Sequence, residues 1–120
     1  MHDMISLVHK IVRKCKDATR GLYIALVIDL SFRLAALVGL LLLAFGYSMW
    51  PLSELELAGL IVGWTLILIT ELQNTAIETA LDRLHPEQHE SIGRSKDIAA
   101  ASSLVSFIFI IFVVIWIYVS

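Results

Sequence analysis

Cysteine, proline and charge are all scarce in this sequence. Its 120 residues include one cysteine and two prolines, and only 17% of them are charged. A single cysteine, Cys15, excludes an internal disulfide, and the absence of a Gly-x-x-x-x-Gly-Lys motif excludes a P-loop nucleotide site. The formal net charge of -2 gives no general basis for binding nucleic acid.

Apolar side chains, in contrast, make up 58% of the residues, and the mean hydropathy is +0.83. A typical soluble domain is about half apolar and about a quarter charged. A soluble fold of this length has too little interior for so many Leu, Ile and Val residues, whereas a bilayer covers apolar faces with lipid. We therefore predict one all-α integral-membrane domain over residues 1–120.

Hydrophobic periodicity and helix breakers predict four helices, over residues 1–21, 22–50, 53–84 and 93–119. The first combines apolar residues at helical spacing with basic residues, as in an amphipathic helix at a membrane surface. The other three are long enough to cross about 30 Å of hydrocarbon. The last is the clearest span, since Ile98 to Ser120 carries no charge. Pro51 marks the turn after the second helix, and His85-Pro86 ends the third.

The distribution of Lys and Arg predicts the orientation in the membrane. The N-terminal segment is basic, and Arg83, Arg94 and Lys96 lie around the loop between the last two helices. The turn at residues 47–56 has no Lys or Arg. Loops rich in Lys and Arg stay in the cytoplasm, and three spans place both basic regions on that side.

One polar stripe interrupts the third predicted helix. At about 100° per residue, four side chains fall within an arc of about 80°: Glu71, Asn74, Glu78 and Asp82. Carboxylates near hydrocarbon are costly and usually face a bundle interior or a water-filled cleft. Solvation at the membrane surface is the simpler explanation for Asp82. Glu71 and Glu78 lie in a helix that is apolar on its other faces, so we expect them to be functional.

Charged residues outside this stripe add parts of a phosphoryl-transfer site. Asp29 is a further carboxylate near the same membrane side, and Arg33 follows four residues later, where the two can pair on one helix face. Two carboxylates with water and phosphate oxygens suit Mg²⁺. Lys96 and Asp97 stand at a helix start, where free N–H groups favour phosphate. Metal, positive charge and a carboxylate for the hydroxyl proton suffice for phosphoryl transfer.

Two segments resemble the signature of the prokaryotic diacylglycerol kinase family: ELQNTAIETALDR at 71–83 and EQHESIGRSKD at 87–97. The pattern E-x-x-N-[ST]-A-I-E-x-x-x-D-R with a downstream G-R-x-K-D is highly specific, and the resemblance covers nearly the whole chain. It implies a homotrimer in the bacterial cytoplasmic (inner) membrane, with composite active sites on the cytoplasmic side. It also implies transfer of the γ-phosphate of MgATP to a lipid alcohol, diacylglycerol, giving phosphatidic acid.

The same resemblance assigns roles by position. It implies that Glu71 is the catalytic base and that Asp29 and Glu78 hold Mg²⁺. The residues that match the family's nucleotide and cofactor site are Lys10, Asp29, Glu78, Glu87, Gln88, His89, Lys96 and Asp97. Those that match its lipid-acceptor site are Phe32, Arg33, Glu71 and Asn74. Asp29 stands where the family usually has Glu, and Lys10 stands where an Arg with its bidentate fork is usual.

The second predicted helix departs from the family, which often reads N-E-x-x-F-R-Q-E. Here residues 28–35 read IDLSFRLA, so Ile28, Leu34 and Ala35 replace three polar residues. Because those polar groups are expected near the lipid acceptor, undecaprenol is an alternative substrate. A non-catalytic membrane scaffold is a further alternative. A proton or ion pathway is another, although it does not explain the Lys96-Asp97 pair.

Two other spacings favour plain structural roles. Ser95, Ala99 and Ser103 recur every four residues on the last helix, and such a ladder of small residues predicts close helix packing. His85 and His89 are also four residues apart, but Pro86 between them breaks a helix, so we expect loop histidines.

Overall fold

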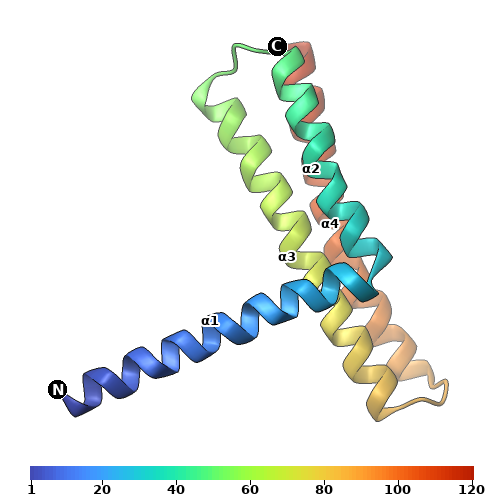
Figure 1. Cartoon of the computed structure of the whole chain (residues 1–120). Helices are drawn as coiled ribbons and strands as arrows, with labels where there is room; N and C mark the ends of the chain where they lie inside the picture. The colour runs from blue at the N-terminus through green and yellow to red at the C-terminus, as the bar shows by residue number, and fades with distance from the viewer.

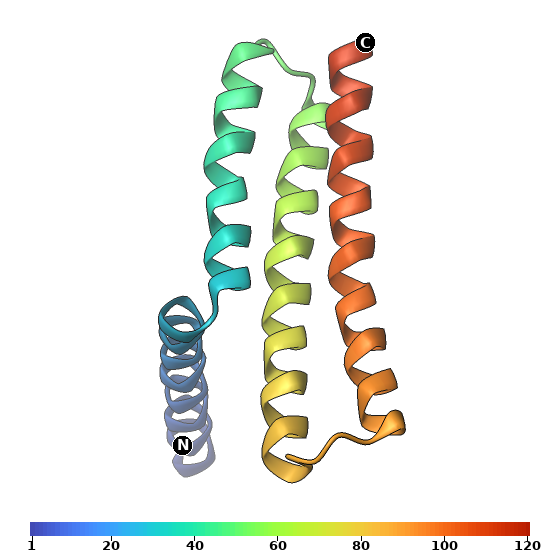
Figure 2. The ribbon, with the colours of Figure 1, turned by 90° about the vertical axis from the view of Figure 1, so that its right-hand side faces the viewer.

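The computed structural model describes residues 1–120 as four helices and no strand. In chain order they are α1 (His2–Ile28), α2 (Leu30–Ser48), α3 (Glu54–Leu84) and α4 (Glu90–Val119). Helices α2, α3 and α4 form an up-and-down bundle, and each is long and apolar enough to cross a membrane. Figure 2 shows the α2–α3 turn and the C-terminus at one end of this bundle and the α3–α4 loop at the other. The predicted architecture of one surface helix and three spans is confirmed.

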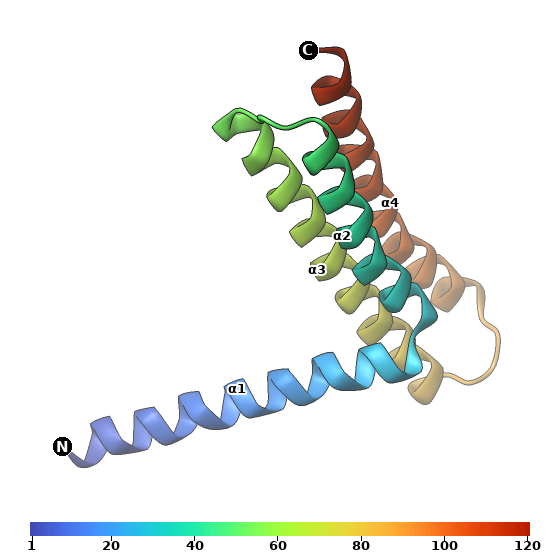
Figure 3. The same cartoon turned by 45° about the horizontal axis from the view of Figure 1, so that its top comes forward.

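Helix α1 projects sideways from the bundle, and its N-terminal half lies clear of the other helices (Figures 1 and 3). Its aliphatic side chains, among them Ile5, Val8 and Ile11, are exposed. Its basic residues, Lys10 and Arg13 among them, are exposed as well. A helix with one aliphatic face and one basic face is built to lie in the plane of a membrane surface, with the aliphatic face in lipid.

The break between α1 and α2 lies at Asp29, so the prediction that it lies between Gly21 and Leu22 was wrong. Asp29 has an extended conformation (φ -115°, ψ 109°), and its Oδ1 accepts a hydrogen bond from the Ser31 N–H at 3.1 Å. Gly21 stays helical in open space. One glycine in a helix costs only about 1 kcal/mol relative to alanine. A side chain that caps the new helix stabilises a break at its own position.

Arg33 stabilises the other side of this break. Its Nη1 donates hydrogen bonds to the carbonyl oxygens of Leu26 at 3.2 Å and Val27 at 2.8 Å. These carbonyls belong to the last turn of α1, where backbone acceptors have no partner in the helix. The predicted pairing of Asp29 with Arg33 was therefore wrong, because each side chain caps a different helix.

The remaining helix ends follow their capping residues. The Ser53 hydroxyl accepts from the Glu56 N–H at 3.1 Å while Glu56 Oε1 accepts from the Ser53 N–H at 2.9 Å, a capping box that starts α3. His89 caps α4 by accepting from the Ser91 N–H at 3.2 Å. Helix α4 therefore begins at Glu90. The sequence-based prediction that it begins at Gly93 was wrong by three residues.

Helices α3 and α4 pack along a continuous seam. The buried residues of α4 recur at alternating spacings of four and three: Ala99, Ser103, Ser106, Ile110, Val113 and Ile117. Those of α3 are Leu60, Gly63, Ile67 and Glu71. This spacing is typical of helices packed side by side with a small crossing angle.

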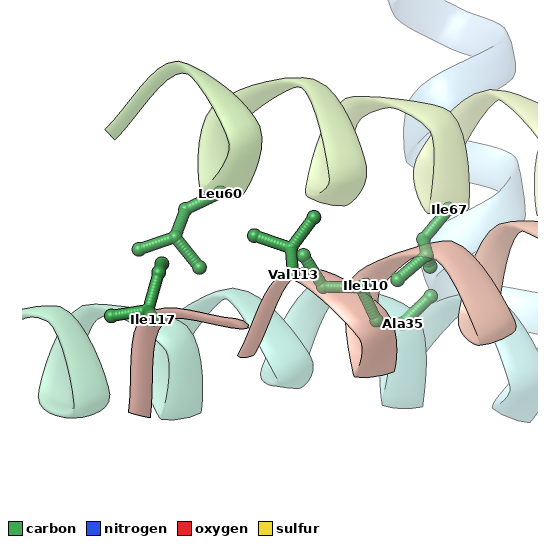
Figure 4. Packing of buried hydrophobic residues seen from close by; sticks show 6 residues of the cluster. All are labelled: Ala35, Leu60, Ile67, Ile110, Val113 and Ile117. Carbon is green, nitrogen blue, oxygen red and sulfur yellow. The ribbon is translucent and has the colours of Figure 1, made fainter. Parts of the chain in front are cut away.

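The apolar core lies in the half of the bundle near the α2–α3 turn. Figure 4 shows its six buried members converging from three helices: Ala35, Leu60, Ile67, Ile110, Val113 and Ile117. Trp64 joins α3 to α2, since its Nε1 donates to the Ala35 carbonyl at 3.0 Å. Toward the α3–α4 loop the buried positions of the seam become polar, and the candidate site lies there.

Candidate active site

The polar half of the α3–α4 seam contains a deeply buried carboxyl group. Thr70 Oγ1 donates to Ser106 Oγ at 3.1 Å, and Glu71, the next residue on α3, is only 7% exposed. Three atoms nearby are buried and lack a hydrogen-bond partner: Glu71 Oε2, Asn74 Oδ1 and Ser103 Oγ. Unpaired buried polar atoms cost free energy, and they call for a specific explanation such as a role in binding or catalysis.

The hinge between α1 and α2 places Asp29 against α3. Thr75 Oγ1 donates a hydrogen bond to Asp29 Oδ2, while Asp29 Oδ1 caps α2. Glu78 is half-buried one turn beyond Thr75, on the same face of α3 as Glu71. The hinge therefore places Asp29 beside the part of α3 that carries Glu71 and Glu78.

Asp29 and Glu78 are the predicted metal ligands, and two carboxylates are too few to hold a metal ion without other ligands. No group of three or more His, Cys, Asp or Glu side chains is arranged to hold an ion by itself. Mg²⁺ is usually held by one or two carboxylates together with waters and substrate phosphates. Each carboxylate oxygen also keeps a second lone pair after accepting one hydrogen bond. The donor set therefore fits a Mg²⁺ ion that is shared with a nucleotide.

A pocket of about 510 Å³ lies at the α3–α4 loop. Four of the predicted nucleotide residues line it: Glu87, Gln88, His89 and Lys96. Lys96 Nζ forms an ion pair with Asp82 Oδ1 and so links the start of α4 to the end of α3. Because the first turn of α4 also lines the pocket, its free N–H groups favour an anion such as phosphate there.

Other predicted site residues lie elsewhere in the single chain. Lys10 is in the N-terminal half of α1, in a separate pocket with His9 and Arg13. Asp97 is exposed on α4 and does not line the loop pocket. Within one chain, the loop residues line one pocket and Lys10 lines another.

Phe32 and Arg33, the two predicted lipid-acceptor residues on α2, both have structural roles in the single chain. Phe32 is 3% exposed, so its ring is packed inside the bundle. The Arg33 guanidinium is used at the end of α1. Glu71 and Asn74, the other two predicted acceptor residues, share the buried polar seam.

Comparison with known proteins decides the family. The sequence matches the family described as prokaryotic diacylglycerol kinase over residues 16–118. This chain belongs to the prokaryotic diacylglycerol kinase family. It is 28% identical over 106 residues to the diacylglycerol kinase of Haemophilus influenzae, which covers 88% of each chain. It is 31% identical over 100 residues to the diacylglycerol kinase of Escherichia coli K12, or 82% of this chain and 80% of that one.

The predicted resemblance is thus confirmed, and the chain is a lipid kinase of a bacterial membrane. Kinases of this family transfer phosphate from a nucleotide with the help of a divalent cation to a lipid in the bilayer. In this kinase the buried Glu71, the half-buried Asp29 and Glu78 and the loop pocket all lie in the half of the bundle nearer the α3–α4 loop.

Two partners in the site were not predicted from the sequence. Thr75 lies on α3 between Asn74 and Glu78, and its place on the polar stripe was the only available signal. Asp82 was recognised as part of the stripe, but its pairing with Lys96 depends on how the intervening loop turns. Ser103, predicted as a packing residue, is buried as expected, but its hydroxyl lies in the polar seam.

Proposed function

We propose that this kinase transfers the γ-phosphoryl group of MgATP to the hydroxyl of diacylglycerol, which yields phosphatidic acid and ADP. The hydroxyl oxygen forms the new bond to phosphorus, and the bond from phosphorus to the β,γ-bridging oxygen breaks. ADP leaves with that electron pair, and Glu71 accepts the hydroxyl proton. The observation that carries this proposal is the Glu71 carboxyl group, 7% exposed and with one oxygen unpaired.

The other residues take roles that fit their positions. Asp29 and Glu78 hold Mg²⁺, which when bound neutralises negative charge on the phosphoryl oxygens. Lys96, the loop residues Glu87, Gln88 and His89, and the first turn of α4 bind the nucleotide phosphates. Asn74, whose Oδ1 is unpaired, holds the acceptor hydroxyl beside Glu71.

The exposure of the polar stripe supports a site at the membrane surface. Along α3 the stripe passes from buried Glu71 through half-buried Glu78 to exposed Asp82. A lipid hydroxyl can therefore approach from the bilayer and ATP from the water. The basic residues of α1 and of the loop region support a position of this end of the bundle on the cytoplasmic side of the inner membrane.

We also propose that the active enzyme is a homotrimer with sites shared between neighbouring copies. The support is Lys10, which lies in the N-terminal half of α1 and lines a pocket separate from the loop pocket of its own chain. Co-assembly of Lys10→Ala subunits with Glu71→Gln subunits should restore turnover that neither variant has alone. Co-assembled variants that regain no turnover would place Lys10 at a site in its own chain.

Undecaprenol is the second candidate acceptor, because three positions around the break between α1 and α2 are apolar here where the family often has polar residues: Ile28, Leu34 and Ala35. Ile28 is 64% exposed and Leu34 is 52% exposed. Ala35 is buried, and its carbonyl is occupied by Trp64. Undecaprenol has one hydroxyl on a long hydrocarbon chain. It therefore needs fewer polar contacts from the protein than diacylglycerol, which also carries two ester groups.

An acceptor panel tests both proposals. The purified kinase is reconstituted in phosphatidylcholine vesicles with Mg²⁺ and γ-labelled ATP, and either dioleoylglycerol or undecaprenol is added. We expect label in the lipid fraction with dioleoylglycerol, and transfer only to undecaprenol would favour the second candidate. No transfer to either lipid and no binding of MgATP would support a non-catalytic scaffold.

The variant Glu71→Gln tests the assignment of the base. Turnover should fall by about a hundredfold to ten-thousandfold, the usual contribution of a general base, whereas MgATP binding measured by equilibrium dialysis should be retained. Wild-type turnover in Glu71→Gln would contradict the assignment.

A further inference from the structure

The register of α3 against α4 places Ser103 opposite Glu71. Nearer the apolar core, a Cβ at Gly63 would lie 2.4 Å from Ile110 Cδ1. Further along, Thr70 contacts Ser106 across the same seam at 3.1 Å. Because the two helices are antiparallel, the next buried position on α4 faces the next buried position on α3. Those residues are Ser103 and Glu71, each 7% exposed.

Both side chains have an unused hydrogen-bonding group at this contact. In this register the Ser103 hydroxyl faces the Glu71 carboxyl group, and neither Ser103 Oγ nor Glu71 Oε2 has a hydrogen-bond partner. A hydroxyl can rotate freely to meet an acceptor. A rotation of Ser103 toward Oε2 therefore satisfies two buried atoms at once, at a site where each unpaired atom is costly.

A comparison with Ser106 shows that packing alone does not account for Ser103. Ser106 is the next buried serine of α4, and its hydroxyl bonds to the Ser102 carbonyl at 3.2 Å and to Thr70. A buried serine in this seam can therefore satisfy itself with local partners. Ser103 Oγ has no such partner, and Ala99 shows that alanine fits the seam one turn earlier.

We propose that Ser103 is a positioning residue for the reaction: its hydroxyl donates to Glu71 Oε2 and fixes the carboxyl group so that Oε1 faces the acceptor hydroxyl. This inference rests on the proposed role of Glu71 as the base. With Oε2 bonded to Ser103, a lone pair of Oε1 stays directed at the proton of the acceptor hydroxyl. A carboxyl group without this bond rotates between orientations, of which only some are productive.

The test measures kcat and KM for ATP and for the lipid in reconstituted vesicles, together with thermal unfolding of each variant. Ser103→Ala should lower kcat by about tenfold to a hundredfold, as expected for loss of a hydrogen bond to a carboxylate. Both KM values should stay within about twofold of wild type. The unfolding temperature should change by no more than about a few degrees. Ser103→Cys, which fills the same space with a weak donor, should show the same loss, and Ser103→Thr should recover most of kcat.

Ser106→Ala is the matched control, because it removes a buried serine from the same seam without touching Glu71. It should lower the unfolding temperature and leave kcat unchanged. Wild-type kcat in Ser103→Ala or in Ser103→Cys would overturn the inference. So would equal loss of kcat in Ser106→Ala, since that result would mean that any loosening of the seam impairs turnover.

A double-mutant cycle of Ser103 with Glu71, together with the variant Glu71→Gln, separates this inference from the proposed function. In the Glu71→Asp background the carboxyl group is withdrawn by one methylene, so the additional loss from Ser103→Ala should shrink to less than about threefold. If Glu71→Gln retains turnover, the base assignment fails and the role of Ser103 fails with it. If Glu71→Gln is inactive while Ser103→Ala turns over normally, only the role of Ser103 fails.

Discussion

Thr75 on α3 donates a hydrogen bond to Asp29 at the hinge between α1 and α2, across 46 positions of sequence. The same carboxylate accepts from the Ser31 N–H through its other oxygen. Asp29 is therefore held through both carboxylate oxygens, and its orientation depends on the contact of the hinge with α3. Groups that hold a metal-binding carboxylate in place tune the metal affinity even though they never touch the ion.

Thr75→Val should weaken activation by Mg²⁺, because it removes the hydroxyl that holds Asp29 while preserving the shape of the side chain. The Mg²⁺ concentration for half-maximal turnover should rise by about tenfold to a hundredfold, measured at saturating ATP and lipid. Thr75→Ser keeps the hydroxyl and should behave like wild type. Thr79→Val, at an exposed position one turn further on, is the control, and equal Mg²⁺ dependence in the two valine variants would refute this role.

Asp29→Asn separates the charge of Asp29 from its capping role. Asparagine caps a helix about as well as aspartate, so the free energy of unfolding should change by less than about 0.5 kcal/mol. Turnover should nevertheless require far more Mg²⁺, since one of the two carboxylates is lost. Asp29→Ala loses both functions and should in addition unfold about 1 kcal/mol more easily. Equal stability of Asp29→Asn and Asp29→Ala would show that the cap contributes little.

The ion pair between Lys96 and Asp82 competes with the proposed role of Lys96 in binding phosphate. The Lys96 side chain is 34% exposed and that of Asp82 is 63% exposed, so solvent screens the pair. Asp82→Asn frees the ammonium group and removes one negative charge from the loop pocket. The KM for ATP should therefore fall by about twofold to fivefold. Lys96→Gln should raise it, and an increased KM in Asp82→Asn would mean that the pair is needed to place Lys96.

Helical periodicity was enough to predict which polar residues of α3 lie on one face. Glu71, Asn74 and Glu78 share one face of α3 because their spacing keeps them within an arc of a helix, whatever the neighbouring helices do. The three spans were equally predictable, since length and hydropathy decide whether a helix can cross a bilayer. Pro86 identified the end of α3 because proline cannot continue a helix.

These local rules could not predict contacts between residues that are far apart in the sequence. The break at Asp29 depends on two side chains that cap opposite helix ends, and a glycine eight residues earlier is the stronger local signal. The bond from Thr75 to Asp29 and the facing of Ser103 and Glu71 depend on helix register, which local patterns do not specify. The family match begins at residue 16, after Lys10, so the role of the first half of α1 rests on its amphipathic pattern.

The contact between α2 and α3 allows a further prediction about stability. A Cβ at Gly39 would lie 2.5 Å from the Trp64 ring, whose Nε1 is bonded to the Ala35 carbonyl. Gly39→Ala should displace this rigid ring and break its hydrogen bond. The free energy of unfolding should fall by about 1–3 kcal/mol, measured by equilibrium unfolding in mixed detergent micelles.

Two other glycines separate the effect of the ring from the effect of the substitution itself. A Cβ at Gly63 would meet the terminal methyl of Ile110 at 2.4 Å, and since that methyl can rotate away, Gly63→Ala should cost less than Gly39→Ala. A Cβ at Gly21 would meet no atom within 4 Å, so Gly21→Ala should stabilise the protein by about 0.5–1 kcal/mol through helix propensity alone. If Gly39→Ala is as stable as Gly21→Ala, then Trp64 moves freely and does not hold α2 against α3.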